Sequence, residues 1–312
     1  MSHRALITCR QMQNCIEEFR GRLHGAGVEL VLPSVVQQPS EDELIAIIGD
    51  FDGMIPGDDP LTARVLEHAG QMKIISKWGI GTDGIDFDAA ARLGIRVTNT
   101  PGVFGDEVAD VAVGYIVMLA RQLHRMHESV VGGGWWKHEG RSLTGTTLGV
   151  VGFGSIGQAL GRRGLGFGMQ ILAYDPWEGA ADVGAAMGVP FVDLDEVFRR
   201  SDFLVLCCPL TAKNRHMVNA ERLALMPDGA SLVNVARGPL VDEAALVDAL
   251  ASGRLFAAAL DVFEEEPLAL DHPLRRFPQC VFGSHNGSNT REGVLRASAD
   301  AVENLLAGLR LP

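Results

Sequence analysis

Short apolar runs alternate along the chain with stretches in which apolar residues recur every three or four positions. In the N-terminal third, the apolar runs predict strands at residues 5–9, 28–32, 53–55, 73–76 and 95–98. Stretches between them, such as residues 41–48 and 62–68, have the period of a helix. Strands that alternate with helices form βαβ units, so we expect a parallel sheet in this part of the chain.

A turn-forming segment at residues 99–102 separates this region from the next. We expect one long buried helix at residues 106–126, because apolar side chains recur there at helical spacing. Residues 132–137 lack such a period and are interpreted as a loop. A second alternating series then begins, with strands predicted at residues 147–151, 170–174, 203–207, 230–235, 256–260 and 279–282.

The crossover helices of this second series predict a doubly wound sheet. A last amphipathic helix is expected at residues 290–309, where one face carries Val294, Ala297, Val302, Leu305 and Leu306. The pattern as a whole predicts an α/β protein with two doubly wound parallel-sheet domains.

The composition is that of a globular protein, with 312 residues of which 47% are hydrophobic and 21% charged. This length allows roughly two domains of ordinary size. The chain has 27 basic and 39 acidic residues and a net charge of −12. Because such a surface repels phosphate backbones, we expect no nucleic-acid partner.

Several other classes of protein are disfavoured by simple features of the sequence. The longest apolar run, residues 111–120, ends at Arg121 and is shorter than the ~20 residues of a membrane span. The first residues carry early charges and have no apolar signal region. Five cysteines without a CxxC pair indicate neither a disulfide framework nor a metal site. We therefore expect a cytoplasmic protein with no membrane association and no metal.

A glycine motif, GFGSIG at residues 152–157, follows an apolar strand and precedes a helix. Asp175 lies at the end of the next predicted strand. This context matches the dinucleotide-binding fingerprint of a Rossmann domain. A bare glycine motif is weak evidence, because many glycine runs are only turns, but the flanking strand, helix and acidic residue strengthen it.

Each part of the motif has a physical role in holding a dinucleotide. Gly152 permits a tight turn, Gly154 allows the pyrophosphate to approach the backbone, and Gly157 allows close packing of helix and strand. The N-terminal turn of the helix, with Ser155 and Ile156, offers N–H groups to the phosphates. Asp175 is expected to accept hydrogen bonds from the ribose and to repel a 2′-phosphate, which favours NAD over NADP. The alternative interpretation is that Asp175 only caps a turn before Pro176.

Three polar side chains follow predicted strands of the second series: Arg237, Glu266 and His285. Because ligands bind at the carboxyl ends of parallel strands, we expect these side chains to converge on the nicotinamide. Arginine offers a planar fork for a carboxylate, histidine exchanges a proton near neutral pH, and a carboxylate orients that histidine. Taken singly, each has a structural alternative: a helix cap, a solvated acidic run or an exposed histidine. Together they indicate hydride transfer to or from a hydroxy acid.

Six segments resemble the D-isomer-specific 2-hydroxyacid dehydrogenases, in particular their phosphoglycerate-dehydrogenase-like branch. They are KWGIGTDGID (77–86), VTNTPGV (97–103), VGFGSIG (151–157), NVARGPLVDEAAL (234–246), ALDVFEEEPL (259–268) and SHNGSNT (284–290). The segments occur in the family's order and cover the chain from residue 77 to residue 290. The resemblance implies an NAD-dependent oxidoreductase that transfers a hydride between nicotinamide and C2 of a small D-2-hydroxy or 2-oxo acid.

The resemblance also implies roles for individual residues. Arg237 matches the arginine that binds the substrate. His285 matches the general acid/base, and Glu266 matches the carboxylate that pairs with this histidine. Asp261 matches the contact to the nicotinamide carboxamide, and the backbone of Gly79, Ile80 and Gly81 matches the loop for the substrate carboxylate. We assign Lys77 to the substrate site as well. The remaining residues assigned to the cofactor are Pro209, Val235, Ala236 and Gly287.

The resemblance further implies a domain arrangement and a quaternary structure. Residues 1–98 and 284–312 are expected to form a flavodoxin-like substrate domain, into which residues 99–283 are inserted as the NAD-binding Rossmann domain. Relatives of this shape are usually homodimers.

Departures from the family pattern limit what is expected of the substrate. Phosphoglycerate enzymes often have an arginine after the third strand, whereas residues 54–59 here read MIPGDD. We therefore doubt that 3-phosphoglycerate is the substrate. Formate dehydrogenases pair the histidine with glutamine, and Glu266 stands here instead. A different class, the dinucleotide-sensing corepressors of the same fold, remains the alternative, although the complete Arg–Glu–His set favours an enzyme.

Overall fold

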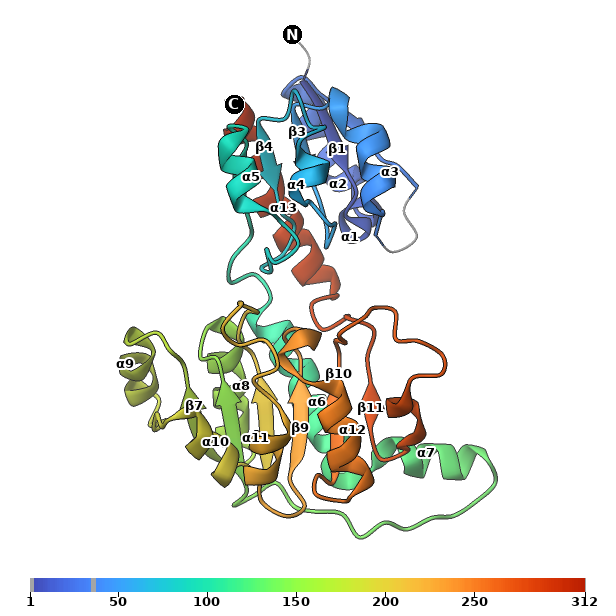
Figure 1. The fold of residues 1–312 in the computed structure, drawn as a ribbon, viewed down its shortest axis with the longest axis vertical. Coiled ribbons are helices and arrows are strands. Elements are labelled where there is room, and N and C mark those ends of the chain that lie inside the picture. The colour runs from blue at the N-terminus through green and yellow to red at the C-terminus, as the bar shows by residue number, and fades with distance from the viewer. Residues whose placement is uncertain (1–2, 35–37, 312) are drawn as a thin grey trace. The chain divides into compact units, whose positions relative to one another are not determined.

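The computed structural model describes residues 3–34 and 38–311, and it divides the chain into two units. Unit 1 contains the chain up to Val103 and from Asn289 onward, and unit 2 is Phe104–Ser288. Both divisions lie a few residues after the expected ones, so residues 284–288, which we expected in the first domain, belong to unit 2. Figure 1 shows the red C-terminal helix beside the blue N-terminal elements of unit 1.

Unit 1 is built on a five-stranded parallel sheet in the order β2-β1-β3-β4-β5. Its strands are β1 (His3–Ile7), β2 (Val28–Val31), β3 (Gly53–Ile55), β4 (Ile74–Ser76) and β5 (Arg96–Thr98). Its helices are α1 (Arg10–Asn14), α2 (Glu17–Gly25), α3 (Glu41–Ile47), α4 (Ala63–Leu66), α5 (Phe87–Arg92) and α13 (Arg291–Leu309), with the 3₁₀ turn η1 (Ile48–Asp50). This order is the flavodoxin-like one, as expected.

Helix α13 joins unit 1 because it packs directly on β3 and β4. A side chain at Gly53 would collide with Leu305 of the helix, and a side chain at Gly308 would collide with Ile74 of the strand. The Ser76 hydroxyl donates to the Ala301 carbonyl over 2.8 Å, and the Trp78 indole donates to the Ser298 hydroxyl over 2.9 Å. The end of the chain therefore completes the core that its beginning starts.

Unit 2 contains a six-stranded parallel sheet in the order β11-β10-β9-β8-β6-β7. The strands are β6 (Thr147–Val151), β7 (Gln170–Tyr174), β8 (Phe203–Leu206), β9 (Ser231–Asn234), β10 (Ala257–Leu260) and β11 (Val281–Phe282). The helices are α6 (Gly105–Arg121), α7 (Leu123–Val131), α8 (Ser155–Gly166), α9 (Gly179–Ala186), α10 (Leu194–Arg200), α11 (Ala220–Leu225) and α12 (Glu243–Ala251), with the 3₁₀ turns η2 (Gly238–Leu240) and η3 (Pro273–Arg276). The expectation of two doubly wound parallel sheets is thus confirmed.

The central strands of unit 2 are mostly apolar and are buried along their whole length because helices cover the sheet, and β9 adds the buried polar residues Ser231 and Asn234. Between β6 and β8 the chain reverses its direction of winding, since β7 lies on one side of β6 and β8 on the other. Such a switch point is where open α/β sheets bind ligands. Helix α8, which starts there, is tied to α6 by Arg163, whose guanidinium lies 3.0 Å from Asp106 and 2.6 Å from Asp110.

The prediction of one long helix at residues 106–126 is wrong in one respect, because the structure interrupts the helix at Gln122. This residue has a left-handed backbone conformation (φ 51°), and it separates α6 from α7. Its side chain is completely buried and donates to the carbonyls of Leu119 (3.1 Å) and Gln279 (3.3 Å). The first bond satisfies a carbonyl at the end of α6, and the second joins the helix end to the segment before β11, which helical periodicity alone does not reveal.

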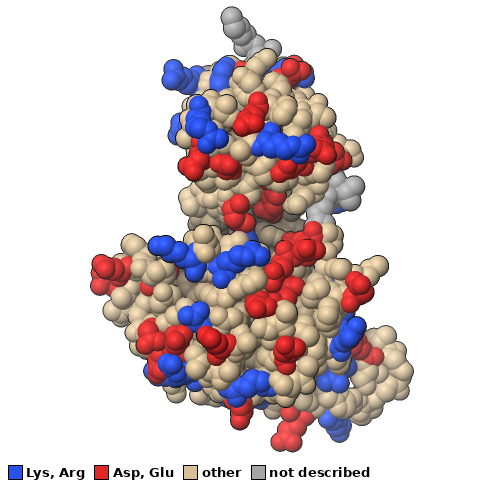
Figure 2. Space-filling view, in the orientation of Figure 1, with Lys and Arg blue, Asp and Glu red and all other residues tan. Residues whose placement is uncertain are grey.

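Charges of both signs are interspersed on the drawn face of each unit (Figure 2). Within residues 3–34 and 38–311, the helices are all too short or too polar to cross a lipid bilayer.

A small group of charged residues is buried beneath the carboxyl ends of β1, β3 and β4 in unit 1. Asp59 is 3% exposed, and its Oδ2 accepts from the Thr8 hydroxyl over 3.0 Å. Its Oδ1 has no hydrogen-bond partner in the part of the chain that the structure describes. Burial raises the pKa of this carboxyl to about 6, although the Thr8 hydroxyl and the nearby Lys77 oppose the rise.

We expect Asp59→Asn to stabilise the protein increasingly as the pH rises. In the folded state the pKa of this carboxyl is about 6, against an ordinary value of 3.8. The wild type therefore loses stability as the pH rises through this window, by an amount on the order of 3 kcal/mol. Urea unfolding at pH 4.5 and pH 8 would show a variant-minus-wild-type difference that grows with pH. A difference that is the same at both values would contradict the buried carboxylate.

Candidate active site

The first glycine of the motif lies at the switch point of the unit 2 sheet. Gly152 follows β6 and has a positive φ of 93°. A Cβ atom at this position would lie 2.6 Å from the backbone nitrogen of Cys208, which follows β8. Only glycine allows the two strand ends to approach this closely.

The other two glycines shape the start of helix α8. A Cβ at Gly157 would lie 2.1 Å from the carbonyl oxygen of Gly152, so the helix could not pack on the loop with a larger residue. A Cβ at Gly154 would meet no atom within 4 Å, which leaves open space at the helix N-terminus. The N–H groups of Ser155 and Ile156 belong to the first turn and have no intrahelical acceptor. This cradle suits the pyrophosphate of a dinucleotide.

Asp175 follows β7 and contacts the glycine loop directly. Its Oδ2 accepts from the backbone N–H of Phe153 over 2.7 Å, and its Oδ1 accepts from that of Trp177 over 2.9 Å. The carboxylate therefore does cap the local turn, and it also ties the glycine loop to β7. A carboxylate oxygen has two lone pairs, so each oxygen retains one acceptor site for a ribose hydroxyl.

The remaining residues assigned to the cofactor lie at the same edge of the unit 2 sheet. Pro209 follows β8, and its carbonyl accepts from the Asn214 side chain over 2.8 Å. Val235 and Ala236 are buried just after β9. The Gly287 N–H donates to Asp261 Oδ2 over 2.8 Å, after β11.

Asp261 is 3% exposed and has hydrogen bonds on both oxygens. Oδ2 accepts from Gly287, and Oδ1 accepts from the Tyr115 hydroxyl over 3.0 Å. Burial and the Asp261 charge raise the pKa of Tyr115, so its hydroxyl remains a donor. Tyr115 was not predicted as a site residue, because it lies on α6, far from Asp261 in sequence, and its spacing there indicated only a buried helix face.

Glu266 and His285 come together after β10 and β11. His285 Nδ1 lies 2.9 Å from Glu266 Oε2, and Glu266 Oε1 accepts from the Phe263 N–H over 3.0 Å. The His285 backbone has a left-handed conformation (φ 54°), and its N–H donates to the Asp261 carbonyl over 2.7 Å. A non-glycine residue keeps this conformation only where its surroundings hold it. A carboxylate at Nδ1 orients the ring.

The loop that carries Arg237 is shaped by its neighbours. The buried Asn234 side chain accepts from the Ala236 N–H over 3.0 Å and donates to the Arg237 carbonyl over 2.9 Å. A Cβ at Gly238 would lie 1.8 Å from the carbonyl carbon of Phe263, so this glycine lets the loops after β9 and β10 touch. Neither Asn234 nor Gly238 was singled out from the sequence, since each is one polar or small residue in a longer motif.

The three consecutive glutamates have different environments. Glu266 contacts His285, Glu265 is exposed, and Glu264 faces helix α12 and the segment with Arg215 and His216. The interpretation of this run as a merely solvated face therefore applies only to Glu265.

The loop assigned to the substrate carboxylate lies after β4 in unit 1. The Gly79 N–H donates to the buried Thr100 hydroxyl over 2.9 Å, and the Asn99 side chain donates to the Ile80 carbonyl over 2.8 Å. In the part of the chain that the structure describes, the N–H groups of Ile80 and Gly81 have no hydrogen-bond partner. They are the donors of this loop that remain for a carboxylate.

Lys77 is buried beneath the same loop, with 5% of its surface exposed. Its ammonium donates to Asp58 Oδ1 over 3.1 Å and to the Trp78 carbonyl over 2.6 Å. Both contacts are made within unit 1, and they tie the segment after β3 to the segment after β4.

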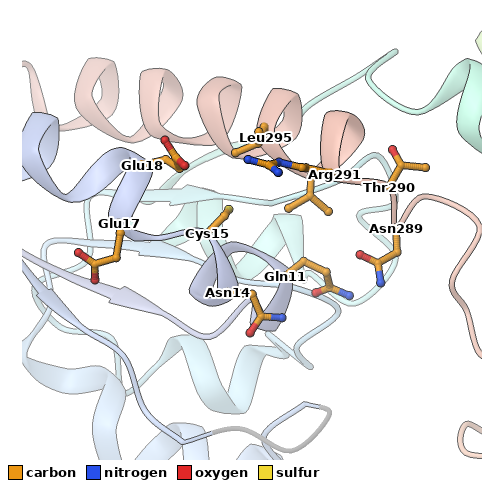
Figure 3. A pocket seen from close by; sticks show the side chains of 10 residues that line it. Gln11, Asn14, Cys15, Glu17, Glu18, Asn289, Thr290, Arg291 and Leu295 are labelled. Carbon is orange, nitrogen blue, oxygen red and sulfur yellow. The ribbon is translucent and has the colours of Figure 1, made fainter.

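A pocket of about 370 Å³ in unit 1 contains none of these residues. It lies between α1, α2 and the first turn of α13, and its lining includes Gln11, Cys15, Glu18, Asn289 and Arg291 (Figure 3). Within the described ranges, no group of three or more His, Cys, Asp or Glu side chains has the geometry of a metal site.

Comparisons with known proteins agree with this geometry. Residues 113–287 match the sequence profile described as D-isomer specific 2-hydroxyacid dehydrogenase, NAD binding domain. The hydroxypyruvate reductase of Thermotoga maritima is 40% identical over 274 residues, which cover 86% of this chain and 88% of that protein. The glyoxylate reductase of Thermofilum pendens is 40% identical over 280 residues, which cover 87% and 82%.

Among solved structures, the D-lactate dehydrogenase of Aquifex aeolicus, complexed with NAD and lactic acid, superimposes with a TM-score of 0.85 at 27% identity. The match covers 98% of this chain and 95% of that one. The chain belongs to the D-isomer specific 2-hydroxyacid dehydrogenase family. It is an NAD-dependent oxidoreductase that acts on the CH–OH group of 2-hydroxy acids or, in reverse, on 2-oxo acids.

Proposed function

We propose that this enzyme reduces small 2-oxo acids of the glyoxylate and hydroxypyruvate type, with His285 as the general acid. The 2.9 Å contact between His285 and Glu266 carries this proposal, because it lies at the same sheet edge as the glycine loop. Its relatives include a hydroxypyruvate reductase and a glyoxylate reductase, which act on substrates of this size.

Each residue of the set has a defined task in the proposed reaction. NAD, when bound, supplies or accepts the hydride at C2. His285 gives a proton to the carbonyl oxygen during reduction and removes it during oxidation. Glu266 holds the imidazole ring and stabilises the imidazolium. Arg237 binds the substrate through its planar guanidinium fork, and the Ile80 and Gly81 N–H groups bind its carboxylate.

In the cofactor site, Gly152, Gly154, Gly157 and the first turn of α8 are proposed to hold the pyrophosphate. Asp175 is proposed to bind the ribose, and Asp261, with Tyr115 behind it, the carboxamide. Pro209, Val235, Ala236 and Gly287 complete the same edge. In this assignment unit 2 is the NAD-binding domain and unit 1 the substrate domain.

The segment after β3 argues for an uncharged substrate side chain. It carries Asp58 and Asp59 and no arginine, and the Lys77 ammonium binds Asp58. A phosphate beside this segment would therefore be repelled by Asp58, whose side chain is 55% exposed. This favours hydroxypyruvate or glyoxylate over 3-phosphohydroxypyruvate, and a panel of 2-oxo acids assayed with NADH tests the choice.

The compartment and the oligomeric state belong to the same proposal. Five cysteines without a disulfide fit a reducing cytoplasm. Helix α7 and the following loop extend from the body of unit 2 (Figure 1), and they expose Val130, Val131 and Trp135 by 52%, 73% and 78%. An apolar surface of this kind calls for a partner. A second copy of the chain is always available to cover it, and most oligomers are symmetric dimers.

Replacement of His285 by Asn is expected to lower kcat for hydroxypyruvate reduction by at least about a hundredfold, because general acid–base groups contribute ~10²–10⁴. NADH binding, followed by fluorescence titration, should change little, since the ring is assigned to the substrate rather than to the nucleotide. If the variant keeps most of the wild-type turnover, His285 has no part in proton transfer.

Cofactor choice tests the assignment of Asp175. The wild type should prefer NADH over NADPH by at least about a hundredfold in kcat/KM, since like charges in contact cost several kcal/mol. Asp175→Ala should reduce this preference, both by relieving repulsion and by releasing the N–H groups of Phe153 and Trp177. Asp175→Ala combined with Pro176→Arg should reduce it further. Equal use of NADH and NADPH by the wild type would show that Asp175 does not face the ribose.

The dimer is tested by adding charge to the exposed apolar residues of helix α7 and the loop that follows it. The double variant Val131→Asp, Trp135→Asp should sediment as a monomer at concentrations where the wild type sediments as a dimer, because burying two carboxylates in an apolar interface is costly. Leu270→Asp serves as the control, since Leu270 is 92% exposed elsewhere in unit 2. A monomeric wild type, or a double variant that still sediments as a dimer, would count against this interface.

A further inference from the structure

Glu243 and Glu264 form a reciprocal pair that joins helix α12 to the loop after β10. The Glu243 N–H donates to Glu264 Oε1 over 3.1 Å, and the Glu264 N–H donates to Glu243 Oε1 over 2.8 Å. Each carboxylate thus accepts from the backbone of the other residue. Such an arrangement fixes two backbone segments against each other rather than only two side chains.

Histidine and arginine side chains from two further segments contact this pair. His272 Nε2, at the start of η3, lies 3.1 Å from Glu243 Oε2. His216 Nε2 lies 3.2 Å from Glu264 Oε1, and Arg215 lies 3.7 Å from its Oε2. The exposed Glu265 is the other acidic group nearby. Glu243 is 8% exposed, and burial raises the pKa of its carboxyl while the Glu264 N–H and His272 oppose the rise.

We propose that Glu243 and Glu264 are a positioning pair for the reaction, which anchors the loop after β10 so that Glu266 stays in contact with His285. This inference rests on the proposed function, because it takes the roles of Glu266 and His285 from there. Neither member of the pair is assigned to the substrate or the cofactor.

The connection between the pair and the reacting histidine is short. Glu264 lies two residues before Glu266, and the Glu266 carboxylate is itself held by the N–H of Phe263. The same stretch supports the Arg237 loop through the close approach of Gly238 to Phe263. A movement of the loop at Glu264 would therefore displace both Glu266 and the adjacent loop that carries Arg237. Misplacement of a catalytic group by about 1 Å can cost 10²-fold in rate.

Two substitutions at Glu264 separate hydrogen-bond reach from charge. Glu264→Asp keeps the negative charge but is one methylene too short to reach the Glu243 N–H. Glu264→Gln loses the charge but keeps an acceptor oxygen at the original reach. We expect Asp to lower kcat by about tenfold, with KM for NADH within about twofold of the wild type, and Gln to lower kcat by less than about threefold.

The pH profile distinguishes positioning from a general loss of stability. A carboxylate beside a histidine favours the protonated ring. If the Glu266 carboxylate is held less firmly against His285, the midpoint of the pH profile of kcat/KM for reduction should therefore move to lower pH. We expect a shift of about half a unit in Glu264→Asp and a larger one in Glu266→Gln. The other charged groups on neighbouring loops, Arg237 and Asp261, are unchanged in both variants.

The double variant Glu264→Asp, Glu266→Gln completes the test. If Glu264 acts through Glu266, the double variant should show the pH midpoint of Glu266→Gln alone, with no further shift. Glu265→Gln is the matched control, one residue away and exposed, and should leave kcat and the midpoint as in the wild type.

The possible failures are distinguishable. If Glu266→Gln leaves the midpoint unchanged, the proposed function is overturned and this inference with it. If Glu266→Gln shifts the midpoint and Glu264→Asp does not, the positioning pair alone is overturned. The positioning pair is also overturned if Glu264→Gln lowers kcat more than Glu264→Asp, because the loss of activity would then follow charge. It is overturned too if the pH shifts of Glu264→Asp and Glu266→Gln add in the double variant. Thermal unfolding of each variant, monitored in parallel, confirms that the compared proteins are folded.

Discussion

In a parallel sheet every strand points the same way, so the loops after all strands gather along one edge. In unit 2 this edge collects the glycine loop after β6, Asp175 after β7, Arg237 after β9, Glu266 after β10 and His285 after β11. No pair of these loops is close in sequence. Their proximity follows from strand direction and order, and the rest of the site depends on it.

Backbone N–H groups and carboxylates hold these loops in place. Asp175 accepts from Phe153, Asp261 from Gly287, Glu264 from Glu243 and Glu266 from Phe263. Hydrogen bonds with an ionised acceptor are stronger than neutral ones, and they satisfy N–H groups that loops would otherwise leave unpaired. Asp59 in unit 1 differs, because one of its oxygens is buried without a partner among the residues that the structure describes. Burial then dominates, and the pKa of that carboxyl rises.

Membership of the 2-hydroxyacid dehydrogenase family defines the reaction, whereas the substrate depends on side chains around the reacting carbon. The proposal that the substrate carries no phosphate rests on the acidic segment after β3. Because Lys77 is already bound to Asp58, it does not offset the carboxylates toward a phosphate. In that proposal the electrostatics of unit 1 bear on substrate choice, while the geometry of unit 2 bears on chemistry.

Much of this protein could be predicted from its sequence alone. The period of apolar residues is a local property, so the strands of both sheets and helices such as α12 and α13 were predictable to within a few residues. The glycine motif and its acidic partner were also recognisable, because their spacing and the flanking strand and helix lie within one short stretch of the sequence. Contacts between distant segments were not predictable. The break at Gln122 depends on a carbonyl after η3, Tyr115 meets Asp261 across the fold, and the Glu243–Glu264 pair joins a helix to a loop. Only the tertiary structure decided these, because hydrogen bonds between segments far apart in the chain leave no period or spacing in the sequence.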